Sequence, residues 1–130
     1  MLSRIHRFHG HNSLSRVYRQ GKAIRDPRVT LRYALNPKRK SFRAAVVVSR
    51  KVSKSAVIRN KIRRRIYEII RPLDSRISDS YDLVFSVYSI EVALMPMNEL
   101  RTLLEEQLLE AAVIKTNELA RSGIVNNKKS

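Results

Sequence analysis

The 130-residue chain contains no cysteine, so neither disulfides nor thiolate-bound metal ions contribute to its stability or chemistry. This composition fits a reducing compartment. No apolar run approaches the roughly 20 residues that a membrane-spanning helix needs, so we expect no segment that spans a membrane. No residue pattern resembles a nucleophile with its base or a pair of catalytic carboxylates, so we expect no catalytic residue in this chain.

Metal-ligand patterns are also missing. Three histidines lie close together near the start of the chain, at His6, His9 and His11. No carboxylate and no turn pattern accompanies them, so we expect no metal site there. Three aspartates later in the chain have the sequence surroundings of loop and cap residues: Asp74, Asp79 and Asp82.

Acidic residues are scarce in the first half of the chain. Residues 1–71 hold 21 lysines and arginines against two acids, Asp26 and Glu68, whereas residues 72–130 hold six against nine. The net charge is +16, and a folded domain with such a one-sided field repels itself unless an anion neutralises it. Nucleic acid is therefore the first expected partner. A membrane surface, an acidic protein and a merely solvated basic face are the alternatives.

The apolar fraction, 43% of the residues, is enough for the core of one domain. Periodicity and capping residues predict three helices, at 12–21, at 55–71 and from Pro96 onward. Alternating or β-branched runs predict three strands, at 28–35, 42–49 and 81–88. The order α-β-β-α-β-α predicts an α+β sandwich of helices on a sheet, with a right-handed β-α-β crossover as the default. We expect one domain over residues 1–112, followed at 113–130 by a helix end and a frayed tail.

The stretch SAVIRNKIRRRIYEIIR, at 55–71, combines dense positive charge with a regular apolar pattern. At 100° per residue, five isoleucines fall on one stripe: Ile58, Ile62, Ile66, Ile69 and Ile70. The opposite face presents arginines, together with Asn60 and Tyr67. Like charges four residues apart destabilise a helix, so a helix that tolerates them is expected to face an anion. Arginine grips phosphate through two hydrogen bonds, which leaves duplex DNA, structured RNA and a phosphate-rich surface open.

The longer stretch SRKVSKSAVIRNKIRRRIYE resembles the signature of the bacterial ribonuclease P protein subunit, Arg-Asn-x-x-Lys-Arg-x-x-Arg-Glu. Five positions carry the match, with arginine in place of the lysine: Arg59, Asn60, Arg63, Arg64 and Glu68. Tyr67 departs from the pattern, which usually has arginine there. The segments RF (7–8) and SLSRVYRQG (13–21) resemble the opening of the same family, so the resemblance covers about residues 4–112.

The resemblance implies a ribosomal-protein-S5-domain-2-like fold with a left-handed β-α-β crossover. It also implies a cytoplasmic ribonucleoprotein that removes the 5′ leader from precursor tRNA. The large RNA of that particle is the catalyst, and it binds most of the Mg²⁺. The protein binds this RNA and the leader, and it requires no protein partner. A ribosomal or RNA-assembly protein with the same basic helix is the main rival, and a DNA-binding architectural protein is a third possibility.

Two sets of site residues follow from the resemblance. The expected contacts with the catalytic RNA are Arg50, Lys51, Lys54, Arg59, Asn60, Lys61, Arg63 and Arg64. The expected cleft for the 5′ leader contains Leu14, Tyr18, Arg32 and, if the strand register shifts by one, Tyr33. Tyr18 could stack on a nucleobase, whereas Leu14 replaces an aromatic residue that is usual in the family. The alternatives are core packing for Tyr18 and a solvated strand face for Arg32.

Overall fold

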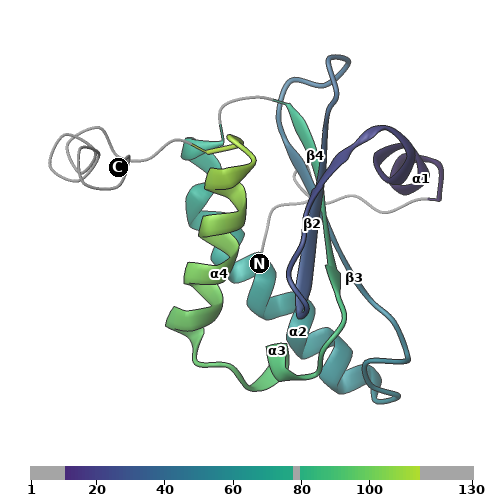
Figure 1. The fold of residues 1–130 in the computed structure, drawn as a ribbon, viewed down its shortest axis with the longest axis vertical. Helices are drawn as coiled ribbons and strands as arrows, with labels where there is room; N and C mark the ends of the chain where they lie inside the picture. The colour runs from purple at the N-terminus through teal and green to yellow at the C-terminus, as the bar shows by residue number, and fades with distance from the viewer. Residues whose placement is uncertain (1–10, 78–79, 115–130) are drawn as a thin grey trace, which may run out of the picture.

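A four-stranded sheet forms the centre of the computed structural model, which describes residues 11–77 and 80–114 (Figure 1). The strands are β1 (Lys22–Ile24), β2 (Val29–Leu35), β3 (Arg43–Val48) and β4 (Tyr81–Val87), in the spatial order β1-β2-β4-β3. β4 pairs antiparallel with β2 and parallel with β3. The parallel pair requires a crossover, which runs through α2 (Ala56–Ile70).

Helices lie on both faces of this sheet. On one face, α2, the short α3 (Glu91–Leu94) and α4 (Met97–Glu110) enclose the main core, whose largest buried side chains include Leu31, Ile62, Ile66, Phe85 and Leu104. On the other face lies α1 (His11–Gln20), the only helix there in the part of the chain that the structure describes (Figure 1). Val17 anchors it over a small cluster formed by Ala34, Ala45 and Val84. The sandwich predicted from the sequence is thus confirmed as a mixed α+β fold.

Three short elements escaped the sequence analysis: β1, α3 and a 3₁₀ helix that continues α2 at Arg71–Arg76. Elements of three to six residues are too short to show a period. The packed part of the chain also continues past residue 112, where we expected the domain to end. Val113 and Ile114 are buried, and Ile114 forms a β-bridge with Ile77.

β2 has a covered second face. Val29, Leu31 and Tyr33 contact the main core, as the alternating sequence predicts. Thr30, on the predicted polar face, is nevertheless only 2% exposed. The alternation of residues in a strand indicates which face is apolar. It does not indicate whether a helix covers the other face, because that depends on the tertiary fold.

Gly21 makes the tight junction between α1 and β1 possible. A Cβ at this position would lie 2.5 Å from the Val17 carbonyl oxygen and 2.6 Å from that of Tyr33. Both atoms belong to the backbone and cannot move aside, so only glycine fits. The junction therefore fixes where the C-terminal end of α1 lies against β2.

Candidate nucleic-acid interface

The first half of α2 carries most of the predicted RNA contacts. The Ser55 side chain caps the helix by accepting a hydrogen bond from the Ile58 amide at 3.3 Å. Ile62, Ile66, Ile69 and Ile70 are buried as predicted, and this anchoring fixes which side of the helix faces solvent. Asn60, Lys61 and Arg64 are exposed on that side. Arg63 is half-buried and donates to the Asn60 side-chain oxygen at 2.8 Å.

The loop before α2 extends the same surface. Arg50, Lys51 and Lys54 are exposed there. Serine side chains shape the loop, since the Lys51 amide donates to the Ser49 hydroxyl and the Ser55 amide to the Ser53 hydroxyl. Arg59 ties the helix back to the loop by donating to the Ser53 carbonyl at 2.9 Å. We call the eight predicted contacts together the basic surface: Arg50, Lys51, Lys54, Arg59, Asn60, Lys61, Arg63 and Arg64.

The prediction for Tyr67 was wrong. Its ring is only 7% exposed and belongs to the main core. The helical angle placed Tyr67 opposite the isoleucine stripe. Tyr67 is nevertheless buried in one cluster with Ile66, Ile70 and Leu73, so a wider sector of the helix is buried than the stripe alone indicates.

Arg65 has a structural role that the sequence analysis missed. Its guanidinium donates to the carbonyl oxygen of Val92 at 2.6 Å and to that of Met95, so it holds both ends of α3 against α2. On the helical wheel Arg65 lies next to Ile58, and Arg63 lies equally close to Ile70. The helical period alone therefore does not distinguish the two arginines.

We expect Arg65→Ala to lower the free energy of unfolding by about 1–3 kcal/mol, because the carbonyl oxygens of Val92 and Met95 lose a charged hydrogen-bond donor. RNA affinity, measured under conditions where the variant is folded, should stay unchanged. Chemical denaturation and a binding titration check the two halves of this expectation. A large loss of affinity with unchanged stability would place Arg65 in the RNA-contacting set instead.

Three of the predicted leader-cleft residues lie on the α1 face of the sheet. Tyr18 is 44% exposed, so it is not a core residue, and its hydroxyl lies 3.1 Å from that of Ser86. The Arg32 guanidinium lies over the Tyr18 ring, 4.8 Å from its centroid, within the range of a cation–π contact. Leu14, one helical turn before Tyr18, is partly buried against the Val17 cluster. Tyr33 lies on the opposite face of the sheet, packed edge-to-face against Tyr81, so the structure separates it from the other three.

Two further residues contact Arg32 on this face: Ser86 in β4 and Tyr88 just after it. No sequence pattern indicated them. Arg32 Nη1 donates at 3.2 Å both to the Ser86 hydroxyl and to the Tyr88 hydroxyl. Tyr88 is 51% exposed, so Arg32 bridges two half-exposed tyrosines. We call Tyr18, Arg32, Ser86 and Tyr88 the tyrosine platform. Period-two alternation in β4 places Ser86 and Tyr88 on one face, but only the pairing with β2 shows that Arg32 shares it.

The charge of Arg32 acts on the Tyr88 phenol. Burial raises the pKa of Tyr88, but hydrogen bonds with Arg32, Thr30 and Ser86 and the Arg32 charge outweigh it. The net pKa lies below the ordinary value for tyrosine. The phenol oxygen is therefore held as an acceptor for Arg32, which fixes the orientation of the ring.

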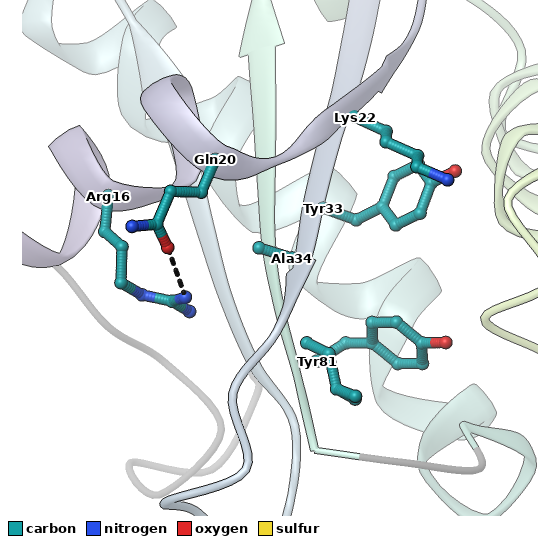
Figure 2. Close-up of a pocket in the computed structure, with 7 residues that line it drawn as sticks. Arg16, Gln20, Lys22, Tyr33, Ala34 and Tyr81 are labelled. Atoms are coloured by element: carbon teal, nitrogen blue, oxygen red, sulfur yellow. Dashed lines mark hydrogen bonds between the residues drawn. The ribbon is translucent and has the colours of Figure 1, made fainter.

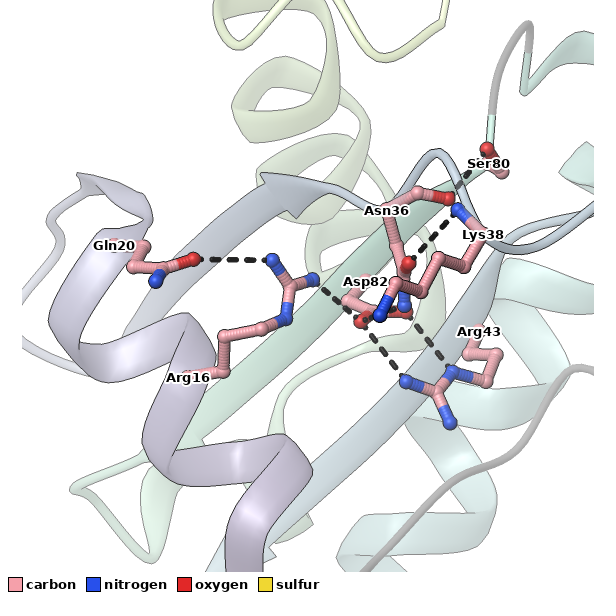
Figure 3. Close-up of polar contacts among 7 residues, drawn as sticks. All are labelled: Arg16, Gln20, Asn36, Lys38, Arg43, Ser80 and Asp82. Atoms are coloured by element: carbon pink, nitrogen blue, oxygen red, sulfur yellow. Dashed lines mark hydrogen bonds and ion pairs between the residues drawn. The ribbon is translucent and has the colours of Figure 1, made fainter.

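A buried carboxylate holds α1 to the sheet on the other flank of the helix, as Figure 3 shows. Asp82 is fully buried in β4 and accepts from Arg16 at 2.8 Å, from Arg43 at 2.9 Å through each of two nitrogens, and from Asn36 at 3.1 Å. Burial raises the pKa of Asp82, but these hydrogen bonds lower it by more, so the net pKa lies below its usual value. The interpretation of Asp82 as a loop or cap residue was therefore wrong.

Of the other aspartates, Asp74 lies in the first turn of the 3₁₀ helix, and Asp79 lies outside the described residues, as do His6 and His9. In the described ranges, no three histidine or acidic side chains come together as a metal-ligand set. The same ranges contain no helix long and apolar enough to span a membrane.

Comparisons with known proteins agree on one family. The family profile described as Ribonuclease P matches residues 2–113. The chain is 33% identical over 119 residues to the Ribonuclease P protein component of Chloroflexus aurantiacus, covering 90% of this chain and 87% of the relative. It is 31% identical over 114 residues to that of Roseiflexus castenholzii, covering 88% and 92%. The structure of Staphylococcus aureus RNase P protein superimposes with a TM-score of 0.75 at 25% identity, covering 85% of this chain and 98% of that one.

Proposed function

The chain belongs to the ribonuclease P protein family, and we propose that its two surfaces bind the two RNAs of that ribonucleoprotein. The basic surface on α2 binds the catalytic RNA, and the tyrosine platform on the α1 face binds the 5′ leader of precursor tRNA. The RNA carries out the cleavage, and the protein positions the substrate in the cytoplasm. The finer fold assignment, a ribosomal-protein-S5-domain-2-like fold with a left-handed crossover, belongs to the same proposal.

The single observation that carries this proposal is the contrast between the two sides of α2. One side is locked into the core by isoleucines that are at most 1% exposed from Ile62 onward. The other side exposes cations and an asparagine, with no acidic residue before Glu68. Phosphate contacts through such cations fix the protein on an RNA without reading its sequence. A structured RNA with a dense phosphate surface is the ligand that fits this side.

Magnesium, which the family implies, is proposed to be held mainly by the RNA. The described residues bring no three histidine or acidic side chains together, and Mg²⁺ is usually held by one or two carboxylates together with phosphate oxygens and water. The buried carboxylate, Asp82, already accepts hydrogen bonds from two guanidinium groups and an amide. The contribution of this chain is therefore neutralisation of phosphate charge and orientation of the leader.

Reconstitution tests the proposal. The full chain, mixed with ribonuclease P RNA, is expected to support 5′ maturation of precursor tRNA at a magnesium concentration where the RNA alone is slow. The chain without RNA is expected to cleave nothing. Robust cleavage by RNA-free protein would contradict the division of labour. Preferred binding to a ribosomal RNA fragment or to duplex DNA in a mobility shift would favour one of the two rival functions.

The tyrosine platform gives a prediction about substrate choice. Tyr18→Ala should weaken binding of precursor tRNA to the assembled particle by about 1–3 kcal/mol, because one stacking surface for the single-stranded leader is lost. Mature tRNA has no leader, so its affinity should barely change. Tyr88→Ala should act in the same direction, since Tyr88 offers the second exposed ring.

The measured quantity is the ratio of precursor to mature affinity at fixed salt and magnesium. Leu94→Ala is a suitable control, because Leu94 is an exposed apolar residue on α3, outside both proposed surfaces. An unchanged ratio in Tyr18→Ala, with the fold intact by circular dichroism, would show that the platform does not bind the leader.

A further inference from the structure

A shallow groove lies at the edge of the sheet where β1 ends. β1 covers β2 only as far as the pairing of Lys22 with Tyr33, so the next two residues of β2 extend beyond it. The groove has a volume of about 290 Å³, near the lower end of the range for small-molecule sites. We call it the edge groove and define it by its lining: Arg16, Gln20, Lys22, Tyr33, Ala34, Leu35 and Tyr81.

The two walls of the edge groove differ in chemistry. Figure 2 shows Arg16 and Gln20 of α1 on one side of Ala34, and Lys22, Tyr33 and Tyr81 on the other. The second wall is aromatic and apolar, because Tyr33 and Tyr81 meet edge-to-face with centroids 6.3 Å apart. Leu35 pairs with Tyr81 across the strands and is 49% exposed, so an apolar surface is available to a ligand.

The charge at the edge groove is positive. Among the described residues, none that lines the groove is acidic. The lining residue Arg16 forms an ion pair with Asp82, and Asp82 also pairs with Arg43. Lys22, on the wall opposite Arg16, is exposed. A lysine ammonium binds phosphate as a point charge.

We propose that the edge groove binds one nucleotide of single-stranded RNA, with the phosphate at Lys22 and the base against Leu35 and the tyrosine wall. Aromatic and apolar walls accept any base, because every base has a π face. The ligand class rests on the proposed function, in which the chain works on RNA. The groove itself is a second site, separate from the basic surface and from the tyrosine platform.

The placement of α1 separates the two sites on its flanks. Tyr18 reaches Ser86, whereas Arg16 reaches Asp82, four residues earlier on β4. This spacing corresponds to about 13 Å along a strand. Val17, packed with Val84, fills the space between them. A nucleotide in the edge groove is therefore not stacked on the tyrosine platform, although one RNA strand could pass over α1 to both.

Nuclear magnetic resonance of the full chain tests the proposal, with a uridine pentanucleotide as the probe. The Tyr18→Ala variant serves as the background, so that binding to the tyrosine platform is weakened. We expect chemical-shift changes at Lys22, Tyr33 and Leu35 as the pentanucleotide is added. Lys22→Gln in this background should weaken binding severalfold and lower its salt slope by about one, as expected for one lost phosphate contact.

Arg101→Gln is the matched control, because it removes one exposed positive charge from α4. It should leave the salt slope close to that of the background. Leu35→Glu, at an exposed position, should abolish the shifts by placing a carboxylate in the wall. Shifts confined to α2, or equal salt slopes for Lys22→Gln and Arg101→Gln, would overturn the proposal. Because this assay needs neither the catalytic RNA nor tRNA, its failure is distinguishable from a failure of the proposed function in reconstitution.

Discussion

Replacing Asp82 with asparagine is expected to lower the free energy of unfolding by about 3 kcal/mol. The carboxylate is fully buried, and it is the shared acceptor of Arg16, Arg43 and Asn36. Removing one partner of a buried ion pair leaves uncompensated charge, which costs about 3–5 kcal/mol. The lower end applies here, because the Arg16 and Arg43 side chains remain 28% and 16% exposed. Urea denaturation of both proteins at neutral pH measures the difference.

The pH dependence of stability provides an independent check. The pKa of Asp82 in the folded protein is lower than its usual value, which is about 3.9 in unfolded chains. A depressed carboxyl pKa stabilises the folded state above the unfolded pKa, and this stabilisation is lost as the pH falls from about 5 through the folded pKa. The wild-type protein should therefore lose more stability over this acid range than Asp82→Asn does.

Asp26→Asn is the matched control for this prediction. Asp26 also pairs with an arginine, Arg28, at 3.0 Å, but both side chains are partly exposed. Such pairs contribute at most about 1 kcal/mol. Equal losses for the two variants would mean that Asp82 behaves as a surface carboxylate, and that its hydrogen bond with Arg16 does not hold α1 to the sheet.

The second large effect is expected at α2, where neighbouring residues should separate stability from binding. Ile62→Ala should lower the free energy of unfolding by about 2–5 kcal/mol, because Ile62 is fully buried and the truncation leaves a cavity. The folded fraction should bind the catalytic RNA as the wild type does. Differential scanning calorimetry and a binding titration on the same preparation measure both quantities.

Arg64→Ala should have the opposite profile. Arg64 is exposed, so stability should change little, while affinity for the catalytic RNA falls and its salt slope drops by about one. Arg59→Ala is a less clean probe, because Arg59 also ties the loop to the helix through Ser53. If Arg64→Ala unfolds the domain while Ile62→Ala melts as the wild type does, the two faces of α2 have been assigned in reverse.

Sequence periodicity predicted features that are set by residues close together in the chain, such as the buried face of a helix. The isoleucine stripe of α2 is the best example, because consecutive members are at most four residues apart and lie on one side of the helix. The family resemblance, carried by Arg59, Asn60 and their neighbours, supplied the function. The profile match and the curated relatives confirm that family assignment.

The features that were missed depend on contacts between distant parts of the chain. Asp82 meets Arg16 across 66 residues and Arg43 across 39, and no local pattern records such partners. Tyr88 meets Arg32 across 56 residues for the same reason. Tyr67 was assigned to the wrong face because the helical wheel assumes one narrow buried side, whereas Tyr67 packs in the main core with Ile66 and Ile70.

Gly21 has a consequence for the evolution of this chain. The backbone oxygens of Val17 and Tyr33 leave no room for a side chain at the junction, and an inserted residue would shift α1 along the sheet. Such a shift would move Tyr18 and Arg16 together. A single insertion would therefore displace Tyr18 from Ser86 and Arg16 from Asp82. The turn that follows Asn36, in which Pro37, Lys38 and Lys40 are exposed, can by contrast change length without moving either flank. Insertions and deletions among homologues should therefore accumulate in that turn and be absent at the α1–β1 junction, which an alignment of family members can check.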